Sequence, residues 1–469
     1  MKARTLAEVA AVTGGTVSAD AAGREFNSVS IDSRTTRPGD LFVAVVGERS
    51  DGHRFVRAAM DAGAAGAMVQ RGAPLDDRHG VVEVEDTRAA LLDLARAARS
   101  ALSATVVGIT GSTGKTCTKD FAAAVLRERF NVVASPASFN NEVGLPLTIL
   151  MAAGDTEVIV CEMGSRGPGH IRLLCDVAQP HIGVVTNVGV AHMELFGSPE
   201  VLRAAKRELP ESLPQDGVAV LNADDPVVKG YAEHTEGKPL FFGRSIDADV
   251  RAKRISVSRQ NGRATFDLVT PSGAASVMLP VPGEHMVSNA LAAAAVGTAL
   301  GLTAEESAVR LESAEVSGGR MEVFKNADDV TVVDDSYNAN PTSMAAALKA
   351  ARWMAGAGRC IAVLGTMAEL GAISAEEHRR IGELLVRVGI DVLITVGEEA
   401  RVIAAGAERE GLERHHIHVC DRVDEAGALV RSLAGPGDLV LVKASRAVGL
   451  DRLAHALRSA QRSMEGSAP

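Results

Sequence analysis

Residues 105 to 119, TVVGITGSTGKTCTK, hold the clearest potential for chemistry in this chain of 469 residues. A β-branched run precedes the glycines and helical spacing follows them, so the stretch predicts a strand, a loop and a helix. Gly111 and Gly114 allow backbone amides to approach an oxyanion. Lys115 adds a positive charge and Thr116 offers a hydroxyl to magnesium. The stretch therefore predicts a nucleotide phosphate site.

The spacing of this loop indicates which class of nucleotide enzyme is involved. It reads G-x-x-G-K-T and not G-x-x-x-x-G-K-[ST], because position 109 is Ile. This departure favours an enzyme other than a GTPase or a motor ATPase. A glycine-rich turn that only caps a core helix is the simpler alternative. The predicted ATP contacts of the loop are Thr110, Gly111, Ser112, Thr113, Gly114, Lys115 and Thr116.

Polar side chains follow two further apolar runs. The run VIVC ends at Glu162, and the run in HIGVVTNVGVAH ends just before His192. Ligands of α/β folds bind at the carboxyl ends of the strands, so we expect this carboxylate and this imidazole near the phosphate loop. Either residue alone is more often a hydrogen-bonded structural group, and the prediction depends on the loop beside them.

Lys206 has an unusual position on the helix predicted for SPEVLRAAKRELPESL. This helix begins with Ser198 as N-cap and Pro199 at its first position. Its apolar stripe consists of Leu202, Ala205, Leu209 and Leu213. Lys206 falls inside that stripe, although the other side of the helix is polar. A buried unpaired charge is costly, so helix geometry alone favours a lysine stem that snorkels to a nearby edge over a chemical role.

Three domains must position these groups, because a chain of this length exceeds the usual size of one domain. Alternating strand-like and helical segments predict an α/β fold throughout. We expect a small N-terminal α/β domain over residues 1–86 and a central domain over 87–316, whose P-loop opens a doubly wound, mostly parallel sheet. A C-terminal Rossmann-like α/β domain is expected over 317–469.

Composition narrows the partners and the compartment. The chain has 49 Lys and Arg against 59 Asp and Glu, a formal charge of -10 and 3% aromatic residues, which disfavours a nucleic-acid partner. Its five cysteines include no C-x-x-C pair, as in proteins with reduced thiols. The N-terminus lacks the apolar core of a signal peptide, and no apolar run is long enough for a bilayer span. We therefore expect a soluble, cytoplasmic protein.

Several segments closely resemble the ATP-dependent muramyl ligases of peptidoglycan synthesis, and the resemblance covers nearly the whole chain. They are TGSTGKT (110 to 116), SFNNEVGLP (138 to 146), EMGSRGPGHI (162 to 171), PHIGVVTNVGVAHMELFGS (180 to 198) and AAKRELPESL (204 to 213). Three others resemble the UDP-binding domain, the adenine-side segment and the C-terminal nucleotide loop of that family. They are residues 32 to 55, 283 to 293 and 334 to 344.

Within the family, three motifs resemble the branch that joins D-alanyl-D-alanine to a UDP-N-acetylmuramoyl-tripeptide. They are DDSYNANP, LGTMAELG and LVKASR, whereas the D-N-P-R signature of the diaminopimelate-adding branch is absent. Two positions depart from the family, which usually has Asp where Thr366 stands and Gly where Ala444 stands. Both lie in the domain expected to receive the dipeptide.

The resemblance implies a reaction and a set of site residues. ATP would phosphorylate the terminal carboxylate of the tripeptide, and the dipeptide amine would attack the resulting acyl phosphate. The implied catalytic residues are Lys115, His192 and Lys206, and two Mg²⁺ ions are implied with ligands among Thr116, Glu162, His192 and a carbamylated Lys206. Further ATP contacts are Asn289, Arg320 and Asp335. Substrate contacts are Ser33, Arg34 and His53 at the uridine diphosphate end, with Asn140 and Asn141 between domains.

Two other functions stay open. One is a ligase like folylpolyglutamate synthase, which has a similar central and C-terminal domain pair, although the DSR and DGH segments of an additional N-terminal domain argue against it. The other is a non-catalytic, nucleotide-dependent binding module, in which Glu162, His192 and Lys206 would have no reason to converge. We expect a monomer.

Overall fold

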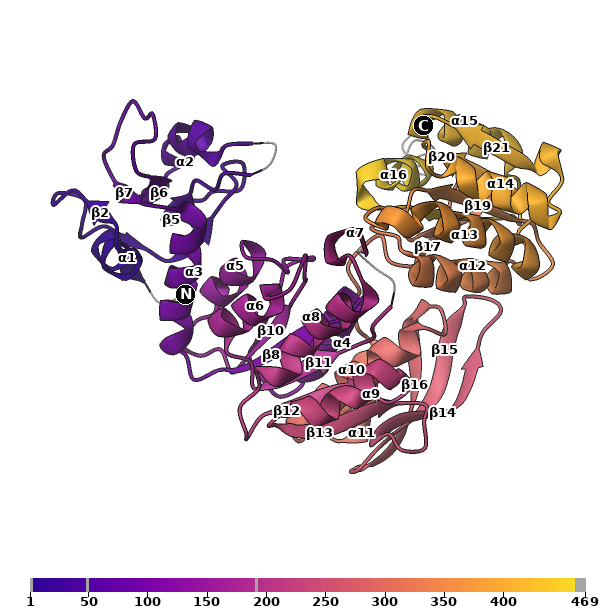
Figure 1. Ribbon diagram of the computed structural model, residues 1–469, viewed down its shortest axis with the longest axis horizontal. Helices are drawn as coiled ribbons and strands as arrows, with labels where there is room; N and C mark the ends of the chain where they lie inside the picture. Colours follow the sequence, from indigo (N-terminus) through magenta and orange to yellow (C-terminus); the bar gives the residue numbers. More distant parts are fainter. Residues whose placement is uncertain (1–2, 48–49, 190–192, 460–469) are drawn as a thin grey trace, which may run out of the picture.

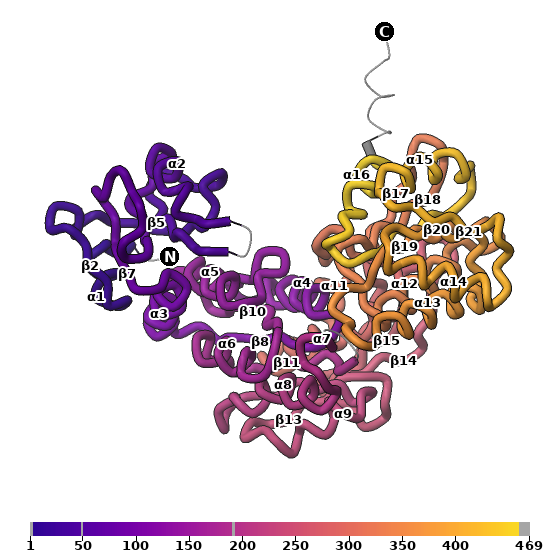
Figure 2. Tube along the Cα trace, turned by 45° about the horizontal axis from the view of Figure 1, so that its top comes forward, coloured from indigo at the N-terminus to yellow at the C-terminus, as the bar shows by residue number. Residues whose placement is uncertain are grey.

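The computed structural model describes residues 3–47, 50–189 and 193–459. Three α/β units follow one another along the chain, each built on its own sheet (Figure 1). The N-terminal and C-terminal units stand at opposite ends of the central one in both Figure 1 and Figure 2. No helix among the described residues is long and apolar enough to cross a membrane. The predicted α/β fold class is confirmed.

The N-terminal unit has a five-stranded sheet in the order β2-β7-β6-β5-β4, with β2 antiparallel to β7 and the other pairs parallel. Its first helix begins at the capping box of Thr5 and Glu8 and ends at Gly14, where φ is 64°. The strands are β1 (Arg4–Thr5), β2 (Thr16–Val17), β3 (Glu25–Phe26), β4 (Ser28–Ser30), β5 (Asp40–Val43), β6 (Gly66–Gln70) and β7 (Val81–Val84), and the helices α1 (Leu6–Thr13) and α2 (Val56–Asp61).

The central unit has a nine-stranded sheet in the order β16-β15-β14-β13-β12-β11-β8-β10-β9. Pairs from β9 to β14 are parallel, and β15 and β16 extend the sheet as an antiparallel meander. The strands are β8 (Thr105–Thr110), β9 (Val132–Ala134), β10 (Val158–Glu162), β11 (Ile182–Val185), β12 (Val218–Asn222), β13 (Lys238–Gly243), β14 (Val250–Val257), β15 (Arg263–Thr270) and β16 (Gly273–Pro282).

Helices cover both faces of this sheet, as a doubly wound fold requires. They are α3 (Thr87–Ser100), α4 (Lys115–Leu126), α5 (Gly144–Met151), α6 (His170–Ala178), α7 (Met193–Phe196), α8 (Pro199–Glu211), α9 (Pro226–Gly230), α10 (Met286–Ala299) and α11 (Ala304–Glu312). Alternate residues of β8 enter two different cores: Val107 and Ile109 pack on the α4 and α10 side, and Val106 packs on the α3 and α5 side.

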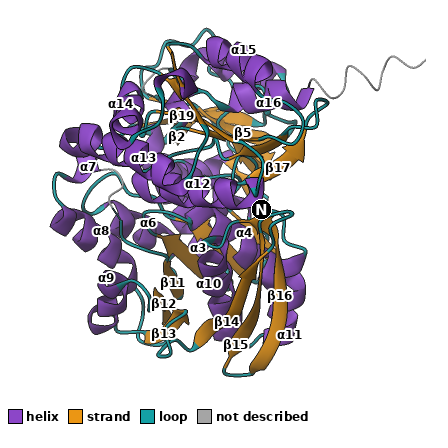
Figure 3. Ribbon diagram, turned by 90° about the vertical axis from the view of Figure 1, so that its right-hand side faces the viewer, coloured by secondary structure: helices purple, strands orange, loops and turns teal. Residues whose placement is uncertain are grey.

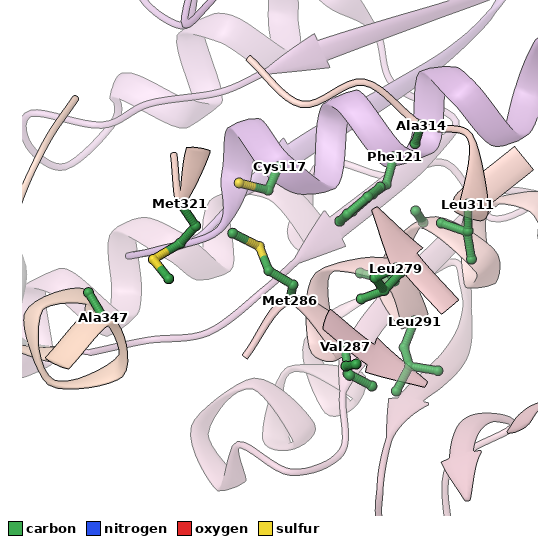
Figure 4. Packing of buried hydrophobic residues seen from close by; sticks show 14 of the residues in the cluster. Cys117, Phe121, Leu279, Met286, Val287, Leu291, Leu311, Ala314, Met321 and Ala347 are labelled. Carbon is green, nitrogen blue, oxygen red and sulfur yellow. The ribbon is translucent and has the colours of Figure 1, made fainter. Parts of the chain in front are cut away.

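The core beneath α4 continues into the C-terminal unit. Figure 4 shows side chains of α4 and α10 packed together beside Leu279 of β16, with Met321 and Ala347 of the C-terminal unit at the edge of the same cluster. The second core joins α3, α5 and α6 to the N-terminal sheet. Both outer units therefore share buried apolar surface with the central one.

The C-terminal unit has a six-stranded sheet in the order β17-β18-β22-β19-β20-β21, parallel apart from β17. Its helix α12 (Pro341–Ala355) lies beyond the end of the long strands β14 and β15 (Figure 1 and Figure 3). The two parts touch, because Trp353 Nε1 donates to Val257 O at 3.2 Å. The strands are β17 (Glu322–Lys325), β18 (Thr331–Asp334), β19 (Cys360–Gly365), β20 (Val392–Val396), β21 (Ile417–Cys420) and β22 (Leu439–Lys443). The helices are α12 (Pro341–Ala355), α13 (Ser374–Val388), α14 (Arg401–Glu410), α15 (Val423–Leu433) and α16 (Asp451–Ser459).

Candidate active site

A cleft of about 630 Å³ lies between the central and C-terminal units. The loop after β8 forms one wall, and the loops after β18 and β22 form the opposite wall. The carboxyl ends of the strands in both sheets therefore face this cleft, which is where α/β folds place ligands.

The predicted strand, loop and helix are present as β8, residues 111–114 and α4. Gly111 and Gly114 have φ of 145° and 79°. A Cβ at Gly111 would overlap Thr186 Oγ1, and a Cβ at Gly114 would overlap Asn289 Oδ1. Both positions therefore require glycine for backbone conformation and for space.

Neighbouring strands hold the phosphate loop in place. Thr113 donates to Asn187 Oδ1 from its amide at 3.0 Å and from its hydroxyl at 3.1 Å. Ser112 Oγ accepts from Gly189 N at 3.0 Å. Lys115 Nζ donates to Gly111 O at 2.8 Å, and burial lowers the pKa of this lysine. Asn187 was not predicted, although its position after the strand-like run HIGVV could have indicated it.

Glu162 ends β10 beside the loop, as the sequence predicts, and its carboxylate is buried. Thr116 Oγ1 donates to Oε2 at 2.7 Å, and Asn140 Nδ2 donates to Oε1 at 2.7 Å. Hydroxyl and carboxylate oxygens are hard ligands that suit Mg²⁺, which usually takes few protein ligands and completes its shell with phosphates and water. Among the described residues, no cluster of three or more His, Cys, Asp or Glu is suited to a metal. The donor set fits magnesium.

Lys206 lies on α8 with only 1% of its surface exposed, so the snorkelling expected from helix geometry is wrong. Burial, assisted by the nearby Lys115 charge, lowers the pKa of Lys206 far below its usual value. Lys206 lines the cleft and has no hydrogen bond or ion pair within residues 3–47, 50–189 and 193–459. His192, the third residue expected here, lies outside the described residues.

The C-terminal unit places two predicted nucleotide contacts in the cleft. Arg320 Nη2 donates to Thr116 Oγ1 at 3.2 Å, and its guanidinium lies 3.8 Å from the ring centre of Tyr337. Asp335 accepts from Lys443 Nζ at 2.5 Å and from Met321 N at 3.1 Å. Tyr337 and Lys443 were not predicted as site residues, although both belong to motifs that the sequence had singled out.

Asn289 reaches the cleft from α10, which brings it against the phosphate loop. Asn141 also lines the cleft, and its Oδ1 accepts from Val143 N and Gly144 N at 3.2 and 2.9 Å, just before α5 begins. Thr110 is buried, and its hydroxyl has no hydrogen-bond partner within the described part of the chain.

The residues predicted to bind uridine diphosphate lie in the N-terminal unit and do not line this cleft. The Arg34 side chain is 86% exposed. Its hydrogen bonds to Asp32 lower the pKa of that carboxyl group to about 2. Both ring nitrogens of His53 have partners, since Nδ1 lies 2.6 Å from Asp51 Oδ1 and Nε2 accepts from Gln70 N at 2.9 Å. His53 therefore holds its own loop, and its ring nitrogens are not free for a ligand. Ser33 follows Asp32 in the same exposed turn.

Fold and cleft together define an ATP-using α/β enzyme, in which a phosphate loop of one domain faces the strand ends of another. Three family models match: "Mur ligase family, catalytic domain" over residues 25–99, "Mur ligase middle domain" over 109–297 and "Mur ligase, glutamate ligase domain" over 319–446. The chain belongs to the Mur ligase family.

Individual relatives resemble it over nearly their whole length. The UDP-N-acetylmuramoyl-tripeptide–D-alanyl-D-alanine ligase of Mycobacterium bovis is 42% identical, with 97% of each chain covered. The structure of MurF from Acinetobacter baumannii has a TM-score of 0.85 at 30% identity and covers 97% of this chain and 99% of that one. MurF ligase from Thermotoga maritima, solved with ADP, has a TM-score of 0.79 at 31% identity, with 93% and 98% covered.

Proposed function

We propose that this chain is an ATP-dependent ligase that forms an amide bond between UDP-N-acetylmuramoyl-tripeptide and D-alanyl-D-alanine in peptidoglycan synthesis. The observation that carries the proposal is the 42% identity over 97% of both chains to a ligase of that name. Similarity across all three units matters, because nucleotide and substrate contacts are expected from each of them. We assign residues 1–86 to the UDP substrate, 87–316 to ATP, and 317–469 to the dipeptide and the nucleotide.

The phosphate loop accounts for the first step. Backbone amides at the start of α4 and the Lys115 ammonium bind the nucleotide phosphates and neutralise the phosphoryl group as it moves to the substrate carboxylate. Thr116 and Glu162 would hold Mg²⁺, which would supply further neutralisation of phosphate oxygens. Arg320, Asp335 and Asn289 contact the nucleotide. The dipeptide amine then attacks the acyl phosphate, and inorganic phosphate leaves.

A carbamate on Lys206 accounts for the buried amine. An amine of lowered pKa is neutral and nucleophilic, so its nitrogen forms a bond to the carbon of CO₂ and releases one proton. The product is an anionic oxygen ligand in place of a buried cation. We assign Lys206, together with Glu162 and His192, to a second Mg²⁺.

The substrate spans the units in this proposal. Ser33 and Arg34 contact the uridine diphosphate end, and His53 contributes by ordering the loop around it. Asn140 and Asn141, at the rim of the cleft, contact the peptide. We assign the enzyme to the cytoplasm as a monomer, and the buried free cysteines of the described chain suit a reducing compartment.

The five-stranded N-terminal sheet argues against the folylpolyglutamate synthase alternative, since that enzyme would need only the central and C-terminal pair. A binding module without catalysis would not require Thr116 and Asn140 to bind both oxygens of one buried carboxylate, with Arg320 bonded to the same threonine hydroxyl.

Turnover tests the proposal directly. Release of ADP and phosphate by the purified protein should require both UDP-N-acetylmuramoyl-tripeptide and D-alanyl-D-alanine, and mass spectrometry should find the UDP-linked pentapeptide. Lys115→Ala should fold normally and lose most of this activity, because the transition state loses several kcal/mol of stabilisation. Equal ADP release without the dipeptide, or with a folate and glutamate in place of both substrates, would refute it.

A further inference from the structure

Lys119 is a buried ammonium that lies behind the cleft and does not line it. It belongs to α4, one turn after Thr116, and is 3% exposed. A lysine ammonium has three N–H donors. Here they meet three acceptors: Ser135 O at 2.9 Å, Ala137 O at 2.9 Å and Asp120 Oδ1 at 2.7 Å. This complete set of partners offsets the cost of burying the charge.

The segment that Lys119 holds, residues 135–140, leads directly to Glu162. Ser135 Oγ accepts from Glu162 N at 3.1 Å, and Asn140 Nδ2 donates to Glu162 Oε1 at 2.7 Å. Between them, Ala137 has a φ of 46°, a left-handed conformation that residues other than glycine rarely adopt. Such a conformation persists where the surrounding contacts impose it, and the bond from Lys119 to the Ala137 carbonyl is one of those contacts.

We propose that Lys119 is a positioning residue for the Glu162 carboxylate. Thr116, on the first turn of α4, binds Oε2 at 2.7 Å. Lys119, on the next turn, anchors the segment whose Asn140 binds Oε1. Both carboxylate oxygens are thereby located relative to one helix, the same helix whose N-terminus receives the phosphates.

This assignment rests on the proposed function, in which Glu162 is a magnesium ligand. Metal sites tolerate displacements of only about 0.5 Å, and the groups that orient a ligand matter nearly as much as the ligand itself. Removal of the Lys119 ammonium leaves the carbonyls of Ser135 and Ala137 without a donor. The segment then relaxes and Asn140 withdraws from Glu162. As a result, magnesium increases the nucleotide affinity by a smaller factor.

Calorimetry can measure that gain without turnover. The Kd of a non-hydrolysable ATP analogue is measured with Mg²⁺ and with EDTA, and the ratio of the two values is the magnesium gain. Lys119→Met should reduce the gain by about tenfold or more, as expected for a residue that orients a metal ligand, while the Kd in EDTA stays unchanged. Lys119→Arg keeps a cationic donor and should restore most of the gain.

Arg99→Met is the matched control. Arg99 is 5% exposed and donates to Ala178 O at 2.9 Å and Leu102 O at 2.8 Å, so it too is a buried cation bound to two carbonyls, but neither carbonyl belongs to the segment that binds Glu162. Its replacement should lower Tm and leave the magnesium gain intact.

An unchanged magnesium gain in folded Lys119→Met would reduce Lys119 to a structural role and overturn the proposal. If that variant does not fold, Asn140→Ala decides, because it removes the amide through which the segment held by Lys119 binds Glu162 Oε1. A gain equal to the wild type there also overturns it. A wild-type chain that shows no magnesium gain at all would instead refute the proposed function together with this assignment.

Discussion

At the scale of single residues, Lys206 shows how folding changes the chemistry of a side chain. Its place on the apolar stripe of α8 removes it from water, and the neighbouring Lys115 charge disfavours the ammonium further. The folded chain therefore binds a proton at Lys206 less readily than the unfolded chain, in which lysine has a pKa of about 10.4. Between the two pKa values, the free energy of unfolding rises with pH.

We predict that Lys206→Met stabilises the protein in CO₂-free buffer at neutral pH and below. The cost of the buried amine is fully present below the folded pKa of Lys206 and disappears above pH of about 10, so the advantage of the variant should shrink by about 1.4 kcal/mol per pH unit within that window. Chemical denaturation of both proteins across pH gives the difference. The same variant should lose ligase activity.

The control for that experiment is Lys229→Met, at a partly exposed lysine that pairs with Asp247 at 3.0 Å. Its effect should stay within about 0.5 kcal/mol and should not follow the same pH window. Bicarbonate should stabilise the wild type and not Lys206→Met, because only the former can form the carbamate. A stability difference that is flat from pH 6 to about 10 would contradict the lowered pKa of Lys206.

At the scale of elements, the turn from β8 into α4 combines a conformational requirement with a steric one. Gly114 and Gly169 both have φ of 79° and both precede a helix. A side chain at Gly114 would overlap Asn289 Oδ1, whereas a Cβ at Gly169 would meet nothing within 4 Å. The two positions therefore separate the cost of conformation from the cost of displacing Asn289.

We predict that Gly114→Ala weakens ADP binding by about tenfold or more, which corresponds to about 1.4 kcal/mol, because Asn289 and the loop amides must shift. Gly169→Ala should lose only about 1–2 kcal/mol of stability from its left-handed backbone and keep the ADP affinity of the wild type. Calorimetric titration with ADP and thermal unfolding measure the two quantities. Equal ADP affinity in the two variants would show that the Asn289 contact is unimportant.

At the scale of the whole molecule, α12 and the β14–β15 hairpin form a contact between the C-terminal and central units. Trp353 is the sole tryptophan of the chain and is 43% exposed. Its ring lies 4.5 Å from the Arg259 guanidinium, and its Nε1 donates to the carbonyl of Val257. Tryptophan emission therefore reports on this one interface.

We predict that the emission of Trp353 shifts to longer wavelength when an ATP analogue and the UDP substrate bind together, and not with either alone. Contacts from separate units complete the site only when those units rearrange. The rearrangement would break the hydrogen bond from Trp353 Nε1 to Val257 O and expose the indole ring. Fluorescence titration measures the shift, and Trp353→Phe must abolish it. Unchanged emission under saturating ligands would mean that the units do not move at this interface.

The sequence alone determined the local features of this protein, because they depend on neighbouring residues. The phosphate loop and the start of α8 at Ser198 were both predicted and are both present. The capping boxes at Thr5 and Thr303 also depend only on residues three apart in the sequence. The strand that ends at Glu162 was also predicted, since a buried parallel strand has a continuous apolar run. Helical periodicity placed Lys206 on the apolar face of α8.

Only the tertiary structure decided what those groups touch. Thr116 is hydrogen-bonded to Glu162, which is 46 residues away in the sequence, and to Arg320, which is 204 residues away. No local sequence pattern predicts contacts over such separations. Helix geometry favoured snorkelling for Lys206, but burial depends on neighbouring elements that the helix cannot specify. The three partners of Lys119 likewise come from a segment that local periodicity does not connect to α4. Side-chain type and spacing thus predicted the class of chemistry, whereas packing over long sequence separation determined the geometry of the site.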